Sequence, residues 1–557
     1  MLNPRSRSLA DDNSNHTRIR RTLTGTLVFV ALALVFGGAH ARAATMSVPA
    51  GADLQAAINA ALPGDTLVLD AGATYVGNFV LPNKAGTGYI TIQSSALTNL
   101  PATSRVTPSQ SSHMPKLLSP GRGEPALRTE VGAHHYRLVG LEIGRTSPDA
   151  LVYDLVALGD GSEQQDTLEE VPHHIVIDRC YIHGDTGDLK RGVQLNSAHT
   201  EIKNSYIAEL HARGQEAQAV GGWNGPGPFL IENNYLEGAG ENVMFGGARA
   251  NGPALVPADI TIRRNHLRKP ADWRGRWTVK NILELKNARR VRIDGNLMEG
   301  NWQDAQQGYA VLFTPRPVDS GEWAAVEDVE FTNNVVRSSA AGLHVSGQDD
   351  RYEPAPRENR LKRVRIANNV FADISYERWG GDGCFLKIVA GTESVTVEHN
   401  TILHNGNITK MGGDPHTNFV FRNNIARHNE YGVFGDGVGY GSNTLAAYSP
   451  GGVFARNAIA REVNAPWNTE LVYPAETFFP ASMQEVGFVD AASGNYRLAS
   501  GSPYRNAGTD GRDLGCDMAA LEAAQGGTPA PTPTPTPTPA PTPRPTPAPA
   551  PLPTPLP

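Results

Sequence analysis

A short pattern of strand, bend and second strand recurs between residues 175 and 460, and it limits what this chain can fold into. Examples are residues 229–236 (FLIENNYL), 260–267 (ITIRRNHL) and 364–371 (VRIANNVF). Polar and apolar residues alternate before each bend, as in a β-strand with one buried face. The copies keep the same unit but are separated by unequal lengths of chain. This predicts stacked coils joined by loops of different size.

The bend of most copies carries an asparagine. These residues are Asn234, Asn265, Asn296, Asn334, Asn369, Asn400, Asn424 and Asn457. Asparagine tolerates the left-handed backbone that a sharp bend needs, and its amide can bond to the asparagines of the coils above and below. A helical solenoid would instead repeat its apolar residues every 3.6 positions. The pattern therefore predicts one continuous all-β solenoid.

The two ends of the chain differ in composition from the repeats. Arg18, Arg20 and Arg21 precede an apolar run at residues 27–36, and residues 41–43 (ARA) form a cleavage motif. We therefore expect residues 1–43 to be a signal peptide, residues 44–525 to be the folded domain, and the protein to be secreted or held at the cell envelope. From Thr528 onward the chain is almost entirely Thr-Pro and Ala-Pro. Residues 526–557 are thus predicted to be a disordered, extended tail that can associate with the envelope.

Charge and cysteine content exclude several classes of function. The net charge of -7 argues against nucleic acid as a partner, because binding it requires clustered cations. Only Cys180, Cys384 and Cys516 are present, too few for a disulfide scaffold or a cysteine-zinc site. We expect them to be buried thiols.

With these repeats, residues 46–520 resemble the pectate-lyase-like right-handed parallel β-helix superfamily. Residues 48–69 resemble its N-terminal capping helix, and residues 496–517 resemble the closing segment of many secreted β-helices. The resemblance implies a single right-handed parallel β-helix of roughly ten coils. It also implies an extracellular polysaccharide as partner. Since the superfamily contains lyases, hydrolases, epimerases, esterases and non-enzymatic adhesins, the fold does not decide the function.

The strand after each bend is expected to face a substrate groove. When these strands are aligned by their apolar positions, Glu284, Lys286, His344 and Lys387 point outward, and Arg316 lies just past the end of its strand. Coils stack about 4.8 Å apart, so Lys286 and Arg316 would lie on neighbouring coils, close enough to contact one sugar.

This arrangement suits β-elimination of a uronate polymer, in which a base removes the proton beside a carboxylate and a cation neutralises that carboxylate. The lysine-then-arginine order is similar to that of the chondroitinase B and alginate lyase family. The similarity implies Lys286 as the base and Arg316 as the acid or charge stabiliser, with Glu284 and His344 as further catalytic candidates. Asn281 stands where that family has an acidic calcium ligand. Calcium is therefore possible as a cofactor but is not supported, and no metal ligands are predicted.

Three alternatives stay open. Asp414-Pro-His416 resembles a motif of mannuronan C-5 epimerases, with Lys387 one coil earlier, although Met411 replaces that family's tyrosine. The chain could also be a non-catalytic glycan-binding or surface protein. Hydrolysis is less favoured, because the candidate aspartates are scattered over loops and coils.

Tryptophans lie in the loops around the Glu284 strand. Trp277 and Trp302 are candidate platforms for stacking on sugar rings. The alternative is that these indoles fasten long loops onto the solenoid.

Overall fold

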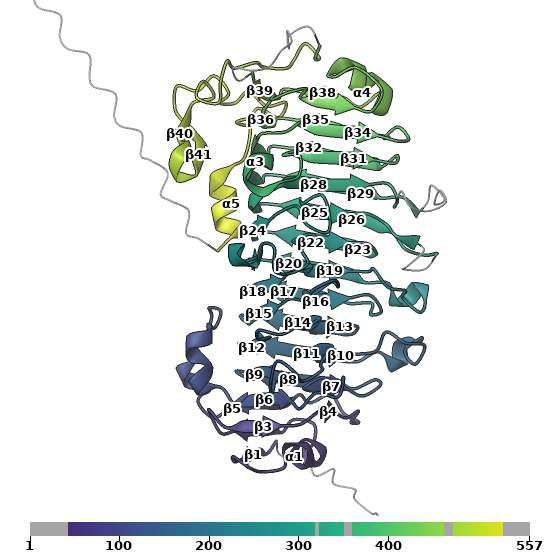
Figure 1. Cartoon of the computed structure of the whole chain (residues 1–557), viewed down its shortest axis with the longest axis vertical. Helices are drawn as coiled ribbons and strands as arrows, with labels where there is room; N and C mark the ends of the chain where they lie inside the picture. Colours follow the sequence, from purple (N-terminus) through teal and green to yellow (C-terminus); the bar gives the residue numbers. More distant parts are fainter. Residues whose placement is uncertain (1–42, 318–321, 350–358, 462–471, 527–557) are drawn as a thin grey trace, which may run out of the picture. The chain divides into compact units, whose positions relative to one another are not determined.

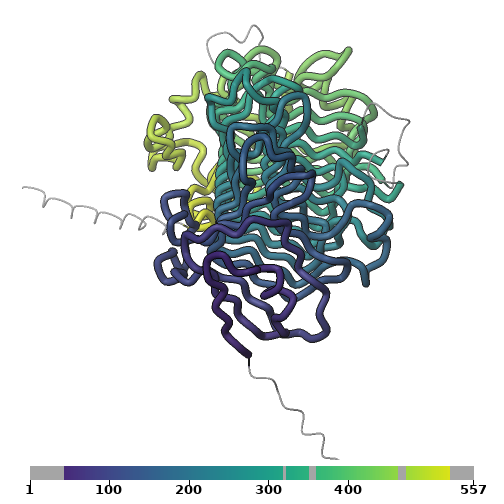
Figure 2. Tube along the Cα trace, turned by 60° about the horizontal axis from the view of Figure 1, so that its bottom comes forward, coloured from purple at the N-terminus to yellow at the C-terminus, as the bar shows by residue number. Residues whose placement is uncertain are grey.

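The computed structural model describes residues 43–317, 322–349, 359–461 and 472–526. Nearly all of the predicted signal peptide and tail lies outside these residues, so both remain predictions. The described chain forms three long parallel sheets of 14, 13 and 12 strands, named here the first, second and third sheets. Each coil passes through them in that order (Figure 1). This confirms the predicted right-handed parallel β-helix, whose stacked coils can be followed by colour in Figure 2.

The strands are short, and each pairs in parallel with strands of the coils before and after it. The first sheet contains β1 (Thr45–Val48), β2 (Thr66–Leu69), β5 (Ile90–Ser94), β8 (His134–Val139), β11 (His173–Asp178), β14 (Ala198–Lys203), β17 (Phe229–Glu232), β20 (Ala258–Arg263), β23 (Ala288–Asp294), β26 (Val326–Thr332), β29 (Lys362–Ala367), β32 (Glu393–Glu398), β35 (Val420–Arg422) and β38 (Val453–Ala455).

The second sheet contains β3 (Thr74–Val76), β6 (Lys116–Ser119), β9 (Glu142–Arg145), β12 (Tyr181–His183), β15 (Tyr206–Leu210), β18 (Tyr235–Gly238), β21 (His266–Arg268), β24 (Leu297–Asn301), β27 (Val335–Ser339), β30 (Val370–Ile374), β33 (Thr401–His404), β36 (Ile425–Arg427) and β39 (Ala458–Ala460).

The third sheet contains β4 (Phe79–Leu81), β7 (Leu127–Thr129), β10 (Asp154–Leu158), β13 (Arg191–Leu195), β16 (Gln218–Gly222), β19 (Glu241–Phe245), β22 (Leu283–Leu285), β25 (Tyr309–Phe313), β28 (Ala341–Ser346), β31 (Leu386–Val389), β34 (Thr409–Gly412) and β37 (Val433–Gly435). The coils outnumber the roughly ten expected, because the N-terminal coils lack the bend asparagine by which the repeats were recognised.

The bend asparagines form a continuous ladder inside the solenoid. Asn296 Nδ2 donates to Asn334 Oδ1 at 3.0 Å, and Asn334 Nδ2 donates to Asn369 Oδ1 at 3.2 Å. The same Oδ1 of Asn334 also accepts the backbone N–H of Asn296 at 2.9 Å. The predicted ladder is confirmed, but the left-handed residue is the one before each ladder asparagine, such as Asn333 (φ 55°) and Asn368 (φ 57°).

Inward-facing apolar side chains fill the space between the sheets in rows that follow the strand register. In the first sheet, Ile262, Ile293, Phe331 and Ile366 are successive partners, and all are fully buried. Because one coil cannot bury its inner face alone, each coil depends on its neighbours for stability. The three cysteines are also buried, as expected.

The ends of this core are covered in different ways. Helix α1 (Leu54–Ala60) begins after Asp53, whose side chain accepts the Ala56 N–H at 2.9 Å, and it buries Leu54 and Ile58 against the first coils. This confirms the capping helix. At the other end, α4 (Ser442–Tyr448) packs near β37.

The expected closing segment lies along the flank of the second sheet rather than over the end of the solenoid. It begins within β41 (Asn495–Leu498), which pairs with β40 (Phe488–Asp490), and it leads into α5 (Met518–Ala524). Tyr496 and Leu521 pack against Val370 of β30. Among the described residues, no helix has the length and apolar character needed to cross a membrane.

Candidate active site

A cavity of about 580 Å³ lies on the outer face of the third sheet, over β22, β25, β28 and β31, and is called the basin below. It is lined by Glu216, Lys280, Glu284, Lys286, Ala305, Gln306, Gln307, Tyr309, Leu312, Thr314, Arg316, His344, Ser346, Gln348, Asp349 and Lys387. The five charged or titratable residues predicted to face the groove all line the basin: Glu284, Lys286, Arg316, His344 and Lys387.

Strand register brings the predicted residues together. Glu284 pairs with Leu312, Leu312 with His344, and His344 with Lys387, so these four side chains occupy one outward column on successive coils. The sheet assignment needs a correction. The strand directly after each asparagine bend belongs to the second sheet, whereas this column lies one strand further on, in the third sheet.

Lys286 and Arg316 lie on neighbouring coils, as predicted. The Arg316 N–H donates to the Lys286 carbonyl at 3.1 Å, and both side chains line the basin. Arg316 also forms an ion pair with Asp349 at 3.1 Å. A backbone hydrogen bond thus fixes the relative position of the two cationic residues.

Glu284 and Lys286 form a buried ion pair rather than a solvated surface pair. Their side chains are 1% and 6% exposed, and Lys286 Nζ lies 3.1 Å from Glu284 Oε1. In the described part of the chain, neither carboxylate oxygen of Glu284 has a hydrogen-bond partner. Buried carboxylates are normally hydrogen-bonded, so this pair is costly to the fold and is available to a ligand.

Lys280 joins two further carboxylates at the same side of the basin. Its ammonium contacts Glu216 and lies 3.4 Å from Glu241. Burial alone would lower the pKa of Lys280, but Glu241, Glu284 and Glu216 outweigh burial and raise it. Burial raises the pKa of Glu241 to about 8, with repulsion from Glu216 and Glu284 adding to the rise.

These carboxylates do not suit the calcium site that the family resemblance would imply. Calcium takes six to eight oxygen ligands. Glu216 and Glu241 instead hold the ammonium of Lys280 between them, and Glu284 pairs with Lys286. No catalytic step is therefore assigned to a metal ion here.

His344 is a neutral ring facing the basin. Burial, with a smaller contribution from Lys387, lowers its pKa to about 3. Its Nε2 has no hydrogen-bond partner among the residues described. The ring lies 5.5 Å from that of Tyr309, whose hydroxyl donates to Asp382 at 3.1 Å. An unpaired ring nitrogen in a cavity can bind a sugar hydroxyl.

The predicted tryptophan platforms lie outside the basin. Trp277 and Trp302 are 5% and 1% exposed and pack with Trp273 and Val279. His211 stacks on Trp277 with ring centroids 3.9 Å apart. Their faces are thus covered by protein, which corrects the sugar-stacking expectation and favours the alternative that they fasten the loops.

Asp414 and His416 also lie outside the basin lining. Asp414 is exposed and pairs with Arg360 at 2.8 Å. His416 is buried, and its Nδ1 accepts the Thr392 N–H at 3.1 Å. Burial lowers the pKa of His416 to about 4. The structure does not bring this motif together with Lys286 and Arg316.

Sequence reasoning missed Glu216, Glu241, Lys280, Tyr309 and Asp349. Glu241 could have been found from strand register, because it begins β19 and pairs with Gln218 at the start of β16 in the third sheet. Lys280 and Asp349 lie outside the strands, where the repeat gives no register. Their positions depend on loop paths that the repeat does not encode.

No family model and no curated protein matches this sequence. Among solved structures, a mannuronic acid specific polysaccharide family 6 lyase from human gut microbiota is 12% identical, with 78% of this chain and 91% of that chain covered at a TM-score of 0.42. An alginate lyase from Paenibacillus sp. str. FPU-7 is 13% identical, with 67% and 94% covered at a TM-score of 0.25.

A GH87 alpha-1,3-glucanase from Streptomyces thermodiastaticus strain HF3-3 is 13% identical, with 75% of this chain and 66% of that chain covered at a TM-score of 0.44. These solved structures therefore include both lyases and a glucanase. The fold of this chain is established by its own sheet topology, which is that of a right-handed parallel β-helix.

Proposed function

We propose that this protein is an exported polysaccharide lyase that cleaves a uronate-containing polymer by β-elimination in the basin. One observation carries the proposal: Lys280, Lys286, Arg316 and Lys387 line a single cavity together with the neutral ring of His344. These four cations outnumber the three carboxylates of the lining, Glu216, Glu284 and Asp349. An excess of cations in a cavity favours a carboxylate-bearing ligand, and it acts most strongly on charge that develops during a reaction.

The extent of the basin suits a polymer. Its residues come from four consecutive strands of the third sheet, β22 to β31, and from the loops beside them. Coils spaced about 4.8 Å apart spread these side chains over roughly 15 Å, more than one sugar ring. Successive sugars of a chain laid along the sheet would therefore contact successive coils.

The reaction follows from these positions. Arg316 neutralises the uronate carboxylate, which makes the neighbouring carbon-bound proton more acidic. Lys286 as the neutral amine takes that proton, and Glu284, 3.1 Å from Nζ, can accept the proton that the ammonium gives up beforehand. The bond to the glycosidic oxygen then breaks and a carbon–carbon double bond forms. The oxygen leaves with the electron pair and takes a proton from Lys286. His344 Nε2 contacts a sugar hydroxyl.

The test is an absorbance assay for unsaturated products with alginate, pectate and glycosaminoglycans as substrates. At least one polymer should give product, and Lys286→Ala should lower the rate by about 10²-fold to 10⁴-fold. Lys203→Ala is the matched control, because Lys203 forms a partly exposed pair with Glu201 on the first sheet, away from the basin. This control should retain the full rate.

Two results would overturn the proposal. Retention of the polymer without any new absorbance would indicate a non-catalytic glycan-binding protein. Exchange of solvent hydrogen into alginate without cleavage would indicate an epimerase.

A further inference from the structure

Five histidines gather on three consecutive strands of the first sheet, away from the basin. They are His134 and His135 on β8, His173 and His174 on β11, and His199 on β14. His173 pairs in register with His134, so the two histidine pairs lie directly on top of each other. A cluster of this kind needs an explanation, because it brings together side chains that become cations when protonated.

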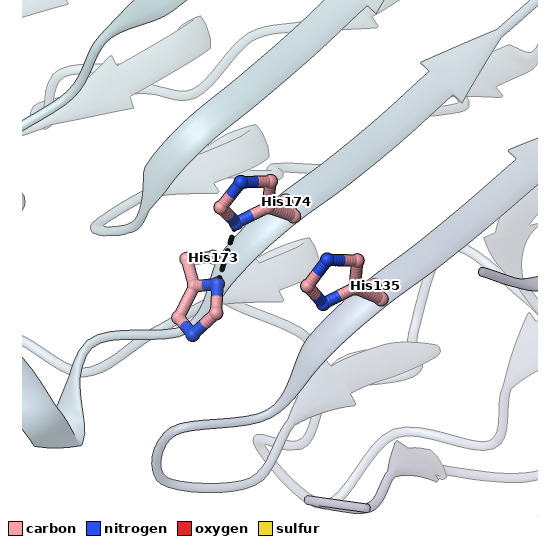
Figure 3. Close-up of side chains that lie close together, drawn as sticks. All are labelled: His135, His173 and His174. Carbon is pink, nitrogen blue, oxygen red and sulfur yellow. Dashed lines mark hydrogen bonds between the residues drawn. The ribbon is translucent and has the colours of Figure 1, made fainter. Parts of the chain in front are cut away.

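Figure 3 shows three of these rings side by side, with His135 and His174 nearly parallel. Their centroids are 4.6 Å apart with an interplanar angle of 4°. His173 Nδ1 lies 2.6 Å from His174 Nδ1. One ligand nitrogen from each of His135, His173 and His174 lies within 4.8 Å of the others, the only such group of three found among the described residues.

The strand positions that align with His135, His174 and His199 carry other residues in later coils of the first sheet. Arg290 bonds Asp259 at 2.7 Å and 2.8 Å, and Arg363 bonds Asp328 at 2.6 Å and 2.9 Å. Those coils place opposite charges next to each other. In the histidine coils, each imidazole ring stacks on another imidazole ring. No ion pair to a carboxylate is found for these rings in the described chain.

We propose that His135, His173 and His174 bind one divalent transition-metal ion, of which Zn²⁺ is the representative. Imidazole nitrogens suit zinc, copper and nickel rather than calcium or magnesium. Metal–nitrogen bonds of about 2.0–2.1 Å put tetrahedral ligand nitrogens about 3.3 Å apart. Small ring rotations would bring nitrogens now within 4.8 Å to that separation.

The surroundings leave room for a fourth ligand. The three rings are half-buried, and His173, His174 and His199 line a cavity of about 570 Å³. Three protein nitrogens and one open position form a site that can hold water or an exchangeable ligand. The ion would also link β8 to β11 and thereby stabilise the N-terminal coils.

The experiment uses the exported chain without a polyhistidine tag, stripped with chelator and titrated with Zn²⁺ by calorimetry. We expect one ion per chain. The variants are His135→Asn and His174→Asn, chosen because both positions have left-handed backbone (φ 60° and 56°), which asparagine tolerates. Each should bind Zn²⁺ at least tenfold more weakly, and the double variant should lose the site.

His113→Ala is the matched control, since His113 ends the 3-10 helix Pro108–His113 outside the cluster, and it should bind as the wild type does. Zn²⁺ should also raise the melting temperature of the wild type but not that of the double variant. Equal affinity of wild type and double variant, or no binding to folded wild type, would overturn the proposal. Lyase activity plays no part in this test.

Discussion

Polar side chains are buried both in the asparagine ladder between the first and second sheets and in the basin on the third sheet. In the ladder, Asn334 accepts two hydrogen bonds from Asn296 and donates to the Ile293 carbonyl and to Asn369. In the basin, Glu284 and His344 keep buried polar atoms without hydrogen-bond partners in the described chain. Of these two regions, only the ladder has its buried polar groups completed by the described protein itself.

This difference separates a structural role from a functional one. A buried polar group that the protein fully satisfies stabilises one conformation and leaves nothing for a ligand. A buried group left incomplete costs stability, and such groups persist in folded proteins mainly where a ligand completes them. The two regions should therefore respond in opposite ways to substitution.

The largest effect on stability is expected in the ladder. Asn334→Ala removes the acceptor for two groups of Asn296 and the donor for the Ile293 carbonyl. Each orphaned group costs about 1–3 kcal/mol, so the free energy of unfolding should fall by about 3 kcal/mol or more. Chemical denaturation measures this change. Asn59→Ala, an exposed asparagine at the end of α1, should change it by less than about 0.5 kcal/mol.

At His344 we expect a small change in stability and a large change in activity. His344→Phe keeps a ring of similar size and removes the unpaired Nε2, and Leu312 already occupies this column one coil earlier. Stability should stay within about 1 kcal/mol of wild type, because no hydrogen bond is lost. The rate of product formation should fall about 10-fold to 100-fold. A variant that loses stability but keeps its rate would show that His344 is structural.

The same contrast explains how far sequence reasoning reached. The solenoid, its capping helix and the ladder could be predicted from a local unit that repeats, because every copy occupies the same position in its coil. Glu284, Lys286, His344 and Lys387 could be placed in one basin, because strand register carries their alignment from coil to coil. Handedness came from the family resemblance rather than from the repeat.

Residues outside the strands were beyond this reasoning. Trp277 and Trp302 pack into a cluster whose partners come from separate coils, so a loop tryptophan gives no sign of whether its face is covered. Lys280 reaches Glu216 across 64 residues of sequence. The burial of Glu284 depends equally on the loops above it, whose paths the repeat does not encode.

A moderate pH effect is expected from Glu241. Its folded pKa of about 8 lies above the ordinary value of 4.5, so the folded state holds its proton more tightly than the unfolded state. This contribution to stability is complete below about pH 4.5 and is lost as pH rises through about 8. Glu241→Gln should make the loss of stability with rising pH smaller.

From about pH 7.5 to 8.5, histidines with lowered pKa values such as His344 are neutral in both states. Burial lowers the pKa of Lys269 to about 7, so Lys269 also contributes to the slope there, and Glu241 is measured by the difference in slope between wild type and Glu241→Gln. Melting temperatures across this window measure the slope. If the melting temperatures of wild type and Glu241→Gln changed equally with pH, the raised pKa of Glu241 would be contradicted. So would the view that the buried groups of the basin lower the stability of the fold.

The smallest effect is expected from chelation, because Lys280 already supplies positive charge between Glu216 and Glu241. EDTA should leave the lyase rate within about twofold of its starting value, since EDTA binds metal ions and not an ammonium group. The same treatment should lower the melting temperature of the zinc-loaded wild type, but not that of the His135→Asn, His174→Asn double variant. If EDTA abolished the rate and calcium restored it, the basin carboxylates would be metal ligands, and their incomplete hydrogen bonding would then mark a cation site rather than a sugar site.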